Sequence, residues 1–296
     1  MKLRYTPNPA SGLSPIEIPA TGTPYELIRD SLYGFGGLAV QHFVSQAPTQ
    51  NGATYFASRY EPRNIMFSFR ISARGFDEVQ ALKRQVSRSF SASFGEGTLR
   101  IYTDVQDTVW YDIVCVPSGT GEMFRVLSGA SDKHCICTVA LTAYSPFWSD
   151  AGQANTITFG TTSGGFTLPF SFPFSLGEPG IGGAENRGSV PTPVIISIEG
   201  AGTNPIITNQ RTGEYISIDY PAQQGDTITV NTDEAITSVI HTAADGTQTD
   251  IFSAVELGSV FFQLLPGLNE ISVVDSGADV PQVVTVSWQN LYLGVF

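Results

Sequence analysis

The chain has 296 residues, of which 42% are hydrophobic and only 14% are charged, against about 25% charged in an average soluble domain. This length favours two domains. The missing charge is replaced by Ser, Thr, Asn, Gln and Gly, a mixture that favours strands and turns over solvated helices. No apolar run has the length of a signal-peptide core or of a membrane span, so we expect neither export nor membrane insertion.

Charge divides the chain into two halves. Residues 1–150 hold 13 Lys or Arg and 13 Asp or Glu, whereas residues 151–296 hold two Arg against 14 acids and carry the whole net charge of −12. This asymmetry predicts a domain boundary near residue 150. Phosphate contacts require clustered Lys and Arg, so specific nucleic-acid binding by the second half is not expected.

The first 63 residues predict an extended edge, a bend and a long loop. Residues 1–33 are rich in Pro, which removes ladder donors and favours a sheet margin. Glycines around Phe35 predict a tight bend before a strand at 38–44. Residues 45–62 predict a polar loop or hairpin with Asn51-Gly52 at its tip.

Exposed aromatic residues beside Arg are typical of a protein interface, so this region also predicts a subunit interface. A loop that folds back on its own domain is the alternative. The candidate interface residues are Phe35, Phe56, Arg59, Tyr60 and Arg63.

The rest of the first half predicts a sheet with one helix packed on it. Apolar residues alternate at 64–73, a strand pattern, and recur every three or four positions at 77–94, a helix pattern that Gly95 would cap. Hairpins are predicted at 98–117 and 125–144. The half closes on an aromatic trio that we expect at an interdomain seam: Tyr144, Phe147 and Trp148.

The pattern of the second half predicts short strands separated by turns. Residues 151–190 are interrupted by Pro and predict linker and crossover strands. From Pro191 onward, about nine or ten strands with turn signals every 8–12 residues predict an antiparallel two-sheet sandwich.

Chemical motifs are scarce. The three histidines lie near no nucleophile elbow, and the sequence holds no P-loop, no zinc-protease motif and no EF-hand loop. A strand would place Cys135 and Cys137 on one face and His134 on the other, which is unsuited to a shared metal site. We therefore expect these two cysteines, and Cys115 as well, to pack as small buried hydrophobic side chains. The residues alone therefore predict an acidic all-β structural or binding module and no enzyme.

A set of turn and strand residues resembles a known family. Together they are similar to the C-terminal domain of the distal tail proteins of long-tailed (siphovirus-like) bacteriophages, and the first half matches that family in layout. The residues are 186–189, 193–200, 204–209, 212–214, Gly225-Asp226 and 264–269, with the closure at 143–148.

The resemblance implies a mainly β protein with a ring-forming domain at 1–150 that carries one packed helix, a linker with crossover strands at 151–190 and a galectin-like antiparallel β-sandwich at 191–296. It implies a structural virion protein: a distal tail adaptor ring, usually a hexamer, that joins the tail tube to the tail tip or baseplate and lets DNA pass. Its partners would be further copies of itself, the tail-tube protein and a tail-tip hub or tail-associated protein. The protein would be assembled in the host bacterial cytoplasm and located in the virion tail tip. No catalytic, metal or cofactor residue is implied.

Two other readings stay open. The sandwich of a tail-tip protein can be a carbohydrate-binding module, with Trp288 or Tyr215 as an aromatic platform, although Trp288 is in phase with Val284 and Val286 and core packing is favoured there. A tail-tube subunit is the other reading, and it would stack into long tubes.

Overall fold

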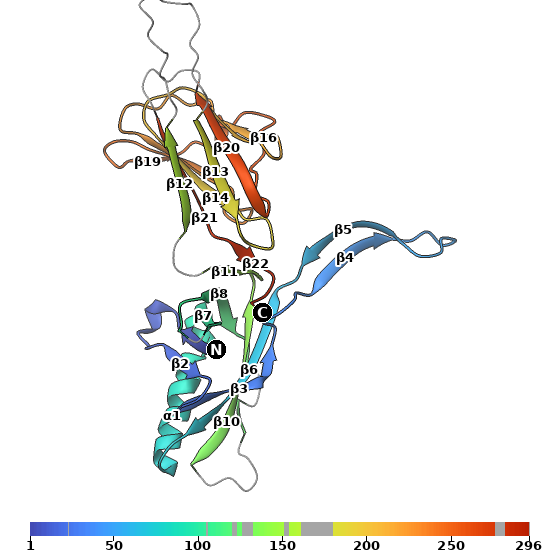
Figure 1. The fold of residues 1–296 in the computed structure, drawn as a ribbon, viewed down its shortest axis with the longest axis vertical. Helices are drawn as coiled ribbons and strands as arrows, with labels where there is room; N and C mark the ends of the chain where they lie inside the picture. The colour runs from blue at the N-terminus through green and yellow to red at the C-terminus, as the bar shows by residue number, and fades with distance from the viewer. Residues whose placement is uncertain are drawn as a thin grey trace, which may run out of the picture. The chain divides into compact units, whose positions relative to one another are not determined.

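The computed structural model describes residues 1–22, 24–104, 106–119, 123–125, 133–150, 154–160, 180–275 and 282–295. The chain forms two compact units, one of Met1–Ala151 with Tyr292–Phe296 and one of Gly152–Leu291. Strands dominate both units, and α1 (Phe76–Ser89) is the one α-helix among the residues just given (Figure 1). The prediction of a mainly β fold with one packed helix is confirmed. None of the described helices is long and apolar enough to cross a membrane.

The first unit is built on an antiparallel sheet with the strand order β2-β1-β7-β8-β10-β6-β3. The short strand β9 pairs with β10, and β11 pairs with β8 and with β22, where the chain returns to this unit. The strands are β1 (Lys2–Thr6), β2 (Ile16–Pro19), β3 (Tyr25–Tyr33), β6 (Arg63–Ser72), β7 (Gly97–Tyr102), β8 (Trp110–Pro117), β9 (Phe124–Arg125), β10 (His134–Ala143), β11 (Trp148–Asp150) and β22 (Leu291–Tyr292).

The predicted extended edge at 1–33 is only partly present. Strand β2 lies at one end of the sheet order and β3 at the other, but β1 is paired on both sides, by β2 and by β7. The physical reason is that residues 2–6 contain no Pro, so every ladder donor of β1 is available; the prolines begin at Pro7.

The buried face of this sheet follows the predicted alternation. On β6, Phe67, Phe69 and Ile71 are buried, and the adjacent strand β10 places Cys137 opposite Phe69 and Cys135 opposite Ile71. All three cysteines are free and buried. His134 points to the other face of β10, where its Nδ1 lies 2.9 Å from the hydroxyl of Ser72. The cysteines therefore act as small core side chains, as predicted.

Helix α1 packs its apolar stripe on the first unit but is shorter than the predicted helix at 77–94. Val79 and Val86 are buried, and Phe90 stacks on Tyr5 with ring centroids 4.4 Å apart. The helix ends at Ser89 because the backbone leaves the helical region at Phe90. A separate 3-10 turn, η2 (Ala92–Phe94), follows, and Gly95 with φ +75° caps this turn rather than the helix.

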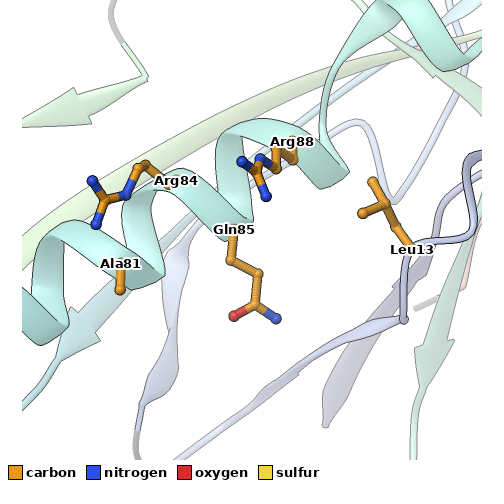
Figure 2. Close-up of a pocket in the computed structure, with 5 residues that line it drawn as sticks. All are labelled: Leu13, Ala81, Arg84, Gln85 and Arg88. Carbon is orange, nitrogen blue, oxygen red and sulfur yellow. The ribbon is translucent and has the colours of Figure 1, made fainter.

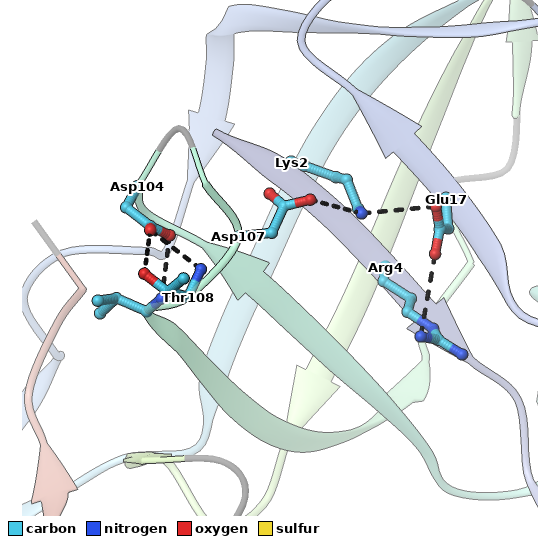
Figure 3. A network of polar contacts seen from close by, with 7 residues as sticks. Lys2, Arg4, Glu17, Asp104, Asp107 and Thr108 are labelled. Atoms are coloured by element: carbon cyan, nitrogen blue, oxygen red, sulfur yellow. Dashed lines mark hydrogen bonds and ion pairs between the residues drawn. The ribbon is translucent and has the colours of Figure 1, made fainter.

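Ion pairs cover the solvent face of β1 (Figure 3). The Lys2 ammonium lies 2.9 Å from Asp107 and 3.5 Å from Glu17, and Glu17 also approaches Arg4 at 3.9 Å. In the nearby loop, Asp104 accepts hydrogen bonds from the backbone N–H groups of residues 108 and 109 and so closes the turn between β7 and β8. Exposed pairs of this kind contribute at most about 1 kcal/mol each.

The second unit contains two antiparallel sheets, as the sequence predicted for a sandwich. Their strand orders are β12-β21-β14-β17-β18-β19 and β13-β20-β15-β16, and buried residues of both sheets form one hydrophobic core. The strands are β12 (Asn155–Gly160), β13 (Gly180–Asn186), β14 (Val194–Glu199), β15 (Pro205–Asn209), β16 (Glu214–Ser217), β17 (Thr227–Asn231), β18 (Ser238–Thr242), β19 (Gln248–Asp250), β20 (Gly267–Asp275) and β21 (Val283–Trp288).

Residues 161–179, in the stretch predicted as linker and crossover strands, lie outside the described residues. Strands β12 and β13 come from the stretch 151–190 that was predicted as linker and crossover strands, and each is an outer strand of one of the two sheets. The predicted domain boundaries stay a prediction.

Buried asparagines close the turns of the second unit. The Asn186 amide donates to the carbonyls of Val190 (2.9 Å) and Leu264 (2.8 Å), and the Asn269 amide donates to the carbonyls of Leu265 and Gly267. Both side chains are buried. Loop carbonyls that would otherwise be buried without partners are thereby satisfied. Asn186 and Asn269 belong to the residues that carry the family resemblance, so that resemblance has a structural basis in these turns.

Candidate subunit interface

An exposed two-stranded arm is the most unusual feature of the first unit. Strands β4 (Val40–Ser45) and β5 (Thr54–Tyr60) pair only with each other, and all their residues are exposed. Figure 1 shows this ribbon extending away from the sheet of its own unit. The hairpin predicted around 45–62 is confirmed. The alternative, a loop that folds back on its own domain, is wrong because both faces of the ribbon are open.

The two faces of the arm differ in chemistry. On one face, His42 lies opposite Ser58, and beyond a register shift Val44 lies opposite Tyr55. The Tyr55 hydroxyl is 3.0 Å from that of Ser58, and its ring is 6.0 Å from the ring of His42, so these side chains share a face. We call this the aromatic face; its members are Val40, His42, Val44, Tyr55, Ser58 and Tyr60.

The opposite face is more polar. Here the Arg59 guanidinium donates to Gln41 at 2.9 Å and lies 5.3 Å from the ring centroid of Phe43. Phe56 lies at the register shift: Tyr55 pairs with Val44 and Ala57 pairs with Phe43, and Phe56 lies between the two pairs. Phe56 is 66% exposed. A bulge commonly redirects a side chain in this way. Phe56 is thus the most exposed aromatic side chain on the arm.

The base of the arm is held by Arg63, the first residue of β6. Its side chain is 2% exposed, and its guanidinium donates to four backbone carbonyls: Gly34 (2.6 Å), Gly36 (2.9 Å), Pro146 (2.7 Å) and Leu293 (2.6 Å). Burial lowers the pKa of Arg63 to about 10, so the group stays charged at neutral pH. One side chain therefore connects three segments that are distant in the sequence.

Aromatic packing surrounds this base. Phe35 stacks on Trp148 with centroids 5.6 Å apart, and the Arg63 guanidinium lies 5.8 Å from the Trp148 ring centroid. Gly34 has φ +83°, and a Cβ there would lie 2.0 Å from the Asn64 carbonyl oxygen. Only glycine fits that bend. The predicted bend before the arm is confirmed.

These contacts correct two of the five predicted interface residues. Phe35 and Arg63 are 1% and 2% exposed, because the bend and the carbonyl cluster enclose them, so they support the arm from inside and offer no surface to a partner. Phe56, Arg59 and Tyr60 lie on the exposed arm. Their role as an interface stays a prediction.

The predicted seam residues have three different environments. Trp148 is fully buried in the core of the first unit, Tyr144 is 69% exposed, and Phe147 packs edge-on against Tyr60 at 5.4 Å. Trp148 is therefore a core residue of its own unit. The seam itself stays a prediction.

Sequence reasoning missed the β4 side of the arm. Val40, Phe43 and Val44 of β4 are large apolar or aromatic side chains, and all are 40–56% exposed. The alternating pattern at 38–44 indicates a strand but carries no signal that nothing covers it. The sequence signal for an uncovered β4 was the strand that follows it, β5, which is polar and rich in aromatic residues.

Asp226 and His241 form a cluster of titratable side chains in the second unit. Asp226 accepts hydrogen bonds from the backbone N–H groups of Gln223 and Ala244, and its Oδ2 lies 3.0 Å from His241 Nε2. The hydroxyl of Tyr220 is 3.4 Å from the other ring nitrogen of His241. The backbone hydrogen bond from Gln223, together with the bond from His241, lowers the pKa of Asp226. This cluster fastens the loop before β17 to β18.

No group of three potential metal-ligating side chains lies together in the described ranges.

The two candidate platform residues for a sugar ring differ in exposure. Trp288 is 6% exposed and belongs to the second core, as its phase predicted, whereas Tyr215 is 39% exposed.

Comparisons with known proteins agree with the fold. A family model for the siphovirus-type tail component, C-terminal domain, matches residues 187–292. The chain is similar in structure to the SPP1 Dit (gp 19.1) protein, described as a paradigm of the hub adsorption apparatus in phages that infect Gram-positive bacteria, with a TM-score of 0.54 and 10% identity over 89% of this chain and 94% of that chain.

Chains of the phage P2 baseplate in its activated conformation also match. The form with Ca gives a TM-score of 0.48 and the form with Sr 0.47, each at 10% identity over 97% of this chain and 98% of that chain. No curated protein matches the sequence. The family match at 187–292 and the fold shared with SPP1 Dit confirm that this chain resembles the distal tail protein family of siphovirus-type bacteriophages.

Proposed function

We propose that this protein is a distal tail adaptor: a structural virion protein that forms a ring, a hexamer, between the tail tube and the tail tip or baseplate and lets DNA pass through. The observation that carries the proposal is the exposed arm, in a chain whose second unit matches a tail-component family. The arm accounts for how copies join.

The arm favours assembly on energetic grounds. A lone two-stranded hairpin is marginal in water at best, and covering a large apolar side chain is worth about 1.5–3 kcal/mol. The arm exposes several such side chains, with Tyr55 at 59% and Phe56 at 66%. An arm that packs on a different surface of the next copy makes a heterologous interface, and an interface of that type gives a ring when the rotation between copies closes. Other copies of this chain are therefore the proposed partners of the arm.

The remaining parts of the proposal concern the second unit and the neighbours of the ring. The two-sheet unit would be a galectin-like sandwich beside the ring, and the ring would contact the tail-tube protein and a tail-tip hub or tail-associated protein. The protein would be assembled in the host bacterial cytoplasm, would reside in the virion tail tip and would have no enzymatic activity. Residues 1–150, the proposed ring, have no net charge, so the ring would lack the excess of positive charge that retains DNA phosphates during passage.

The test removes apolar surface from the arm without touching its base. Tyr55→Ser combined with Phe56→Ser should reduce the ring to single chains in mass photometry, because two side chains are lost from every interface. At about 1.5–3 kcal/mol each, the loss corresponds to a fall of about 100-fold or more in the association constant.

A matched control variant combines Ile236→Ser with Leu257→Ser, which removes two comparably exposed apolar side chains from the second unit. The control should assemble as the wild type does. Normal rings from the arm variant would refute the role of the arm, and so would loss of rings from both variants.

The carbohydrate-binding reading has little support from the packing. Trp288 lies in the core, so an aromatic platform for a sugar ring would depend on Tyr215. The tail-tube reading differs from the adaptor in its product, long tubes in place of closed rings, and imaging distinguishes the two.

A further inference from the structure

A pocket on the solvent side of α1 is not used by any role described above. It has a volume of about 210 Å³ and is lined by Ala81, Arg84, Gln85 and Arg88 of the helix and by Leu13 of the segment before β2. Figure 2 shows the Gln85 amide extending into the space beside the helix, Arg84 and Arg88 on either side of it, and Leu13 beyond the end that carries Arg88. The pocket is thus lined by two apolar side chains, one toward each end, and by two cationic groups.

The two arginines of the pocket lack anionic partners among the described residues. Neither Arg84 nor Arg88 forms an ion pair with a carboxylate in the part of the chain that the structure describes. They are four residues apart on one helix, where like charges destabilise the helix by about 0.2–0.5 kcal/mol. By contrast, Arg100 on β7 forms a two-pronged bond to Asp112, with both distances 2.7 Å.

We propose that this pocket binds an acidic segment of a protein partner, one that presents an apolar side chain next to carboxylates. The apolar side chain would contact Leu13, beside the end of the helix that carries Arg88 (Figure 2). The carboxylates would bridge to Arg84 and Arg88, whose planar guanidinium groups bind carboxylates in a two-pronged geometry, and the Gln85 amide offers a further donor.

A carboxylate fits this site better than a nucleic-acid backbone. A protein that holds nucleic acid by its backbone can make about 6–10 phosphate contacts, whereas two cations line this pocket. Leu13 also offers an apolar contact that suits an amino-acid side chain and that a phosphate cannot use. The inference does not depend on ring formation, because every lining residue belongs to one chain.

The test is a binding titration with the full chain. The probe is a short fluorescein-labelled peptide of alternating Glu and Leu, followed by fluorescence anisotropy at low salt. The wild type should bind it, and Arg84→Gln combined with Arg88→Gln should weaken binding about tenfold or more, since two charge-assisted contacts are lost. All substituted side chains are exposed, so folding should be unchanged, which circular dichroism checks.

The controls separate this site from general attraction between charges. Arg74→Gln combined with Arg125→Gln removes the same charge from exposed positions outside the pocket and should leave affinity within about twofold of wild type. A peptide with Gln in place of Glu should not bind. The proposal is overturned if the wild type fails to bind at millimolar peptide, if both double variants bind equally, or if oligothymidylate binds more tightly than the peptide in a manner that depends on Arg84 and Arg88.

Discussion

Replacing Arg63 by Ala is predicted to destabilise the first unit by about 3–5 kcal/mol, because it leaves four carbonyl groups at a buried position without the donor that satisfies them. Its guanidinium donates four hydrogen bonds, and bonds to a charged group are worth about 1.5–3 kcal/mol each, which gives a gross value of about 6–12 kcal/mol. Burial of the charge, which lowers the pKa of Arg63 to about 10, offsets part of this sum. Water that enters the vacated space offsets a further part.

Differential scanning calorimetry of the purified chain measures the effect, with hydrogen exchange to assign each transition to its unit. At about 2–4 °C per kcal/mol for a domain of this size, the melting temperature of the first unit should fall by about 6–20 °C. The second unit should melt as in the wild type, because every partner of Arg63 belongs to the first unit.

Two further variants define the mechanism. Arg63→Lys keeps the charge but loses the planar fork, so it should lie between wild type and Arg63→Ala. Arg70→Ala removes an exposed arginine from the same strand, one that pairs with Glu26, and should cost less than about 1 kcal/mol. A first-unit melting temperature within about 2 °C of wild type in Arg63→Ala would refute the reasoning, and so would an equal fall in both units.

Two other predictions concern thiols and pH. Burial raises the pKa of all three cysteine thiols, that of Cys115 to about 12, so a thiol reagent such as DTNB at pH 8 should leave the native protein almost unlabelled and should titrate three thiols after denaturation; rapid labelling of the native chain would contradict the placement of these residues in the core. The pKa of Asp226 is lowered in the folded state, so its contribution to stability is present above the unfolded value near pH 4 and is lost as the pH falls through the lowered pKa. Asp226→Asn should therefore flatten the acid-side fall in the melting temperature of the second unit, whereas the exposed control Glu199→Gln should not; an unchanged pH profile in Asp226→Asn would count against the cluster with His241.

The strand pattern was predictable because burial follows the pleat. In β6 and β14 every second residue is buried, and from Ile65 in β6 and Val194 in β14 these buried positions are all apolar, so a local pattern sufficed even though Met66 and Ile195 are apolar and exposed. The same holds for Trp288, whose phase along β21 placed it in the second core. Patterns of this kind depend on neighbours two residues away and are therefore visible in the sequence.

The environment of the arm and its base was harder to predict because it depends on distant segments. Arg63 is adjacent in sequence to the exposed arm, but its guanidinium bonds to a carbonyl 230 residues along the chain. Phe35 likewise lies in a glycine-rich bend and is buried by its stack on Trp148. Exposure at these positions is set by tertiary contacts that no local pattern records.

The end of α1 shows a smaller failure of the same kind. Phe90 and Phe94 continue the apolar spacing of the helix, so the pattern extended the prediction to residue 94. In the structure Phe90 is buried against Tyr5 and the chain then turns, so that Phe94 is 39% exposed. A periodic pattern gives the face of a helix more reliably than its last residue.

Imaging the assembled protein tests the central claim most directly. Negative-stain electron microscopy combined with mass photometry of the wild-type chain at micromolar concentration should show closed rings with six times the 31.8 kDa mass of one chain. A species that stays at the mass of one chain, or that stacks into open tubes, would contradict the adaptor.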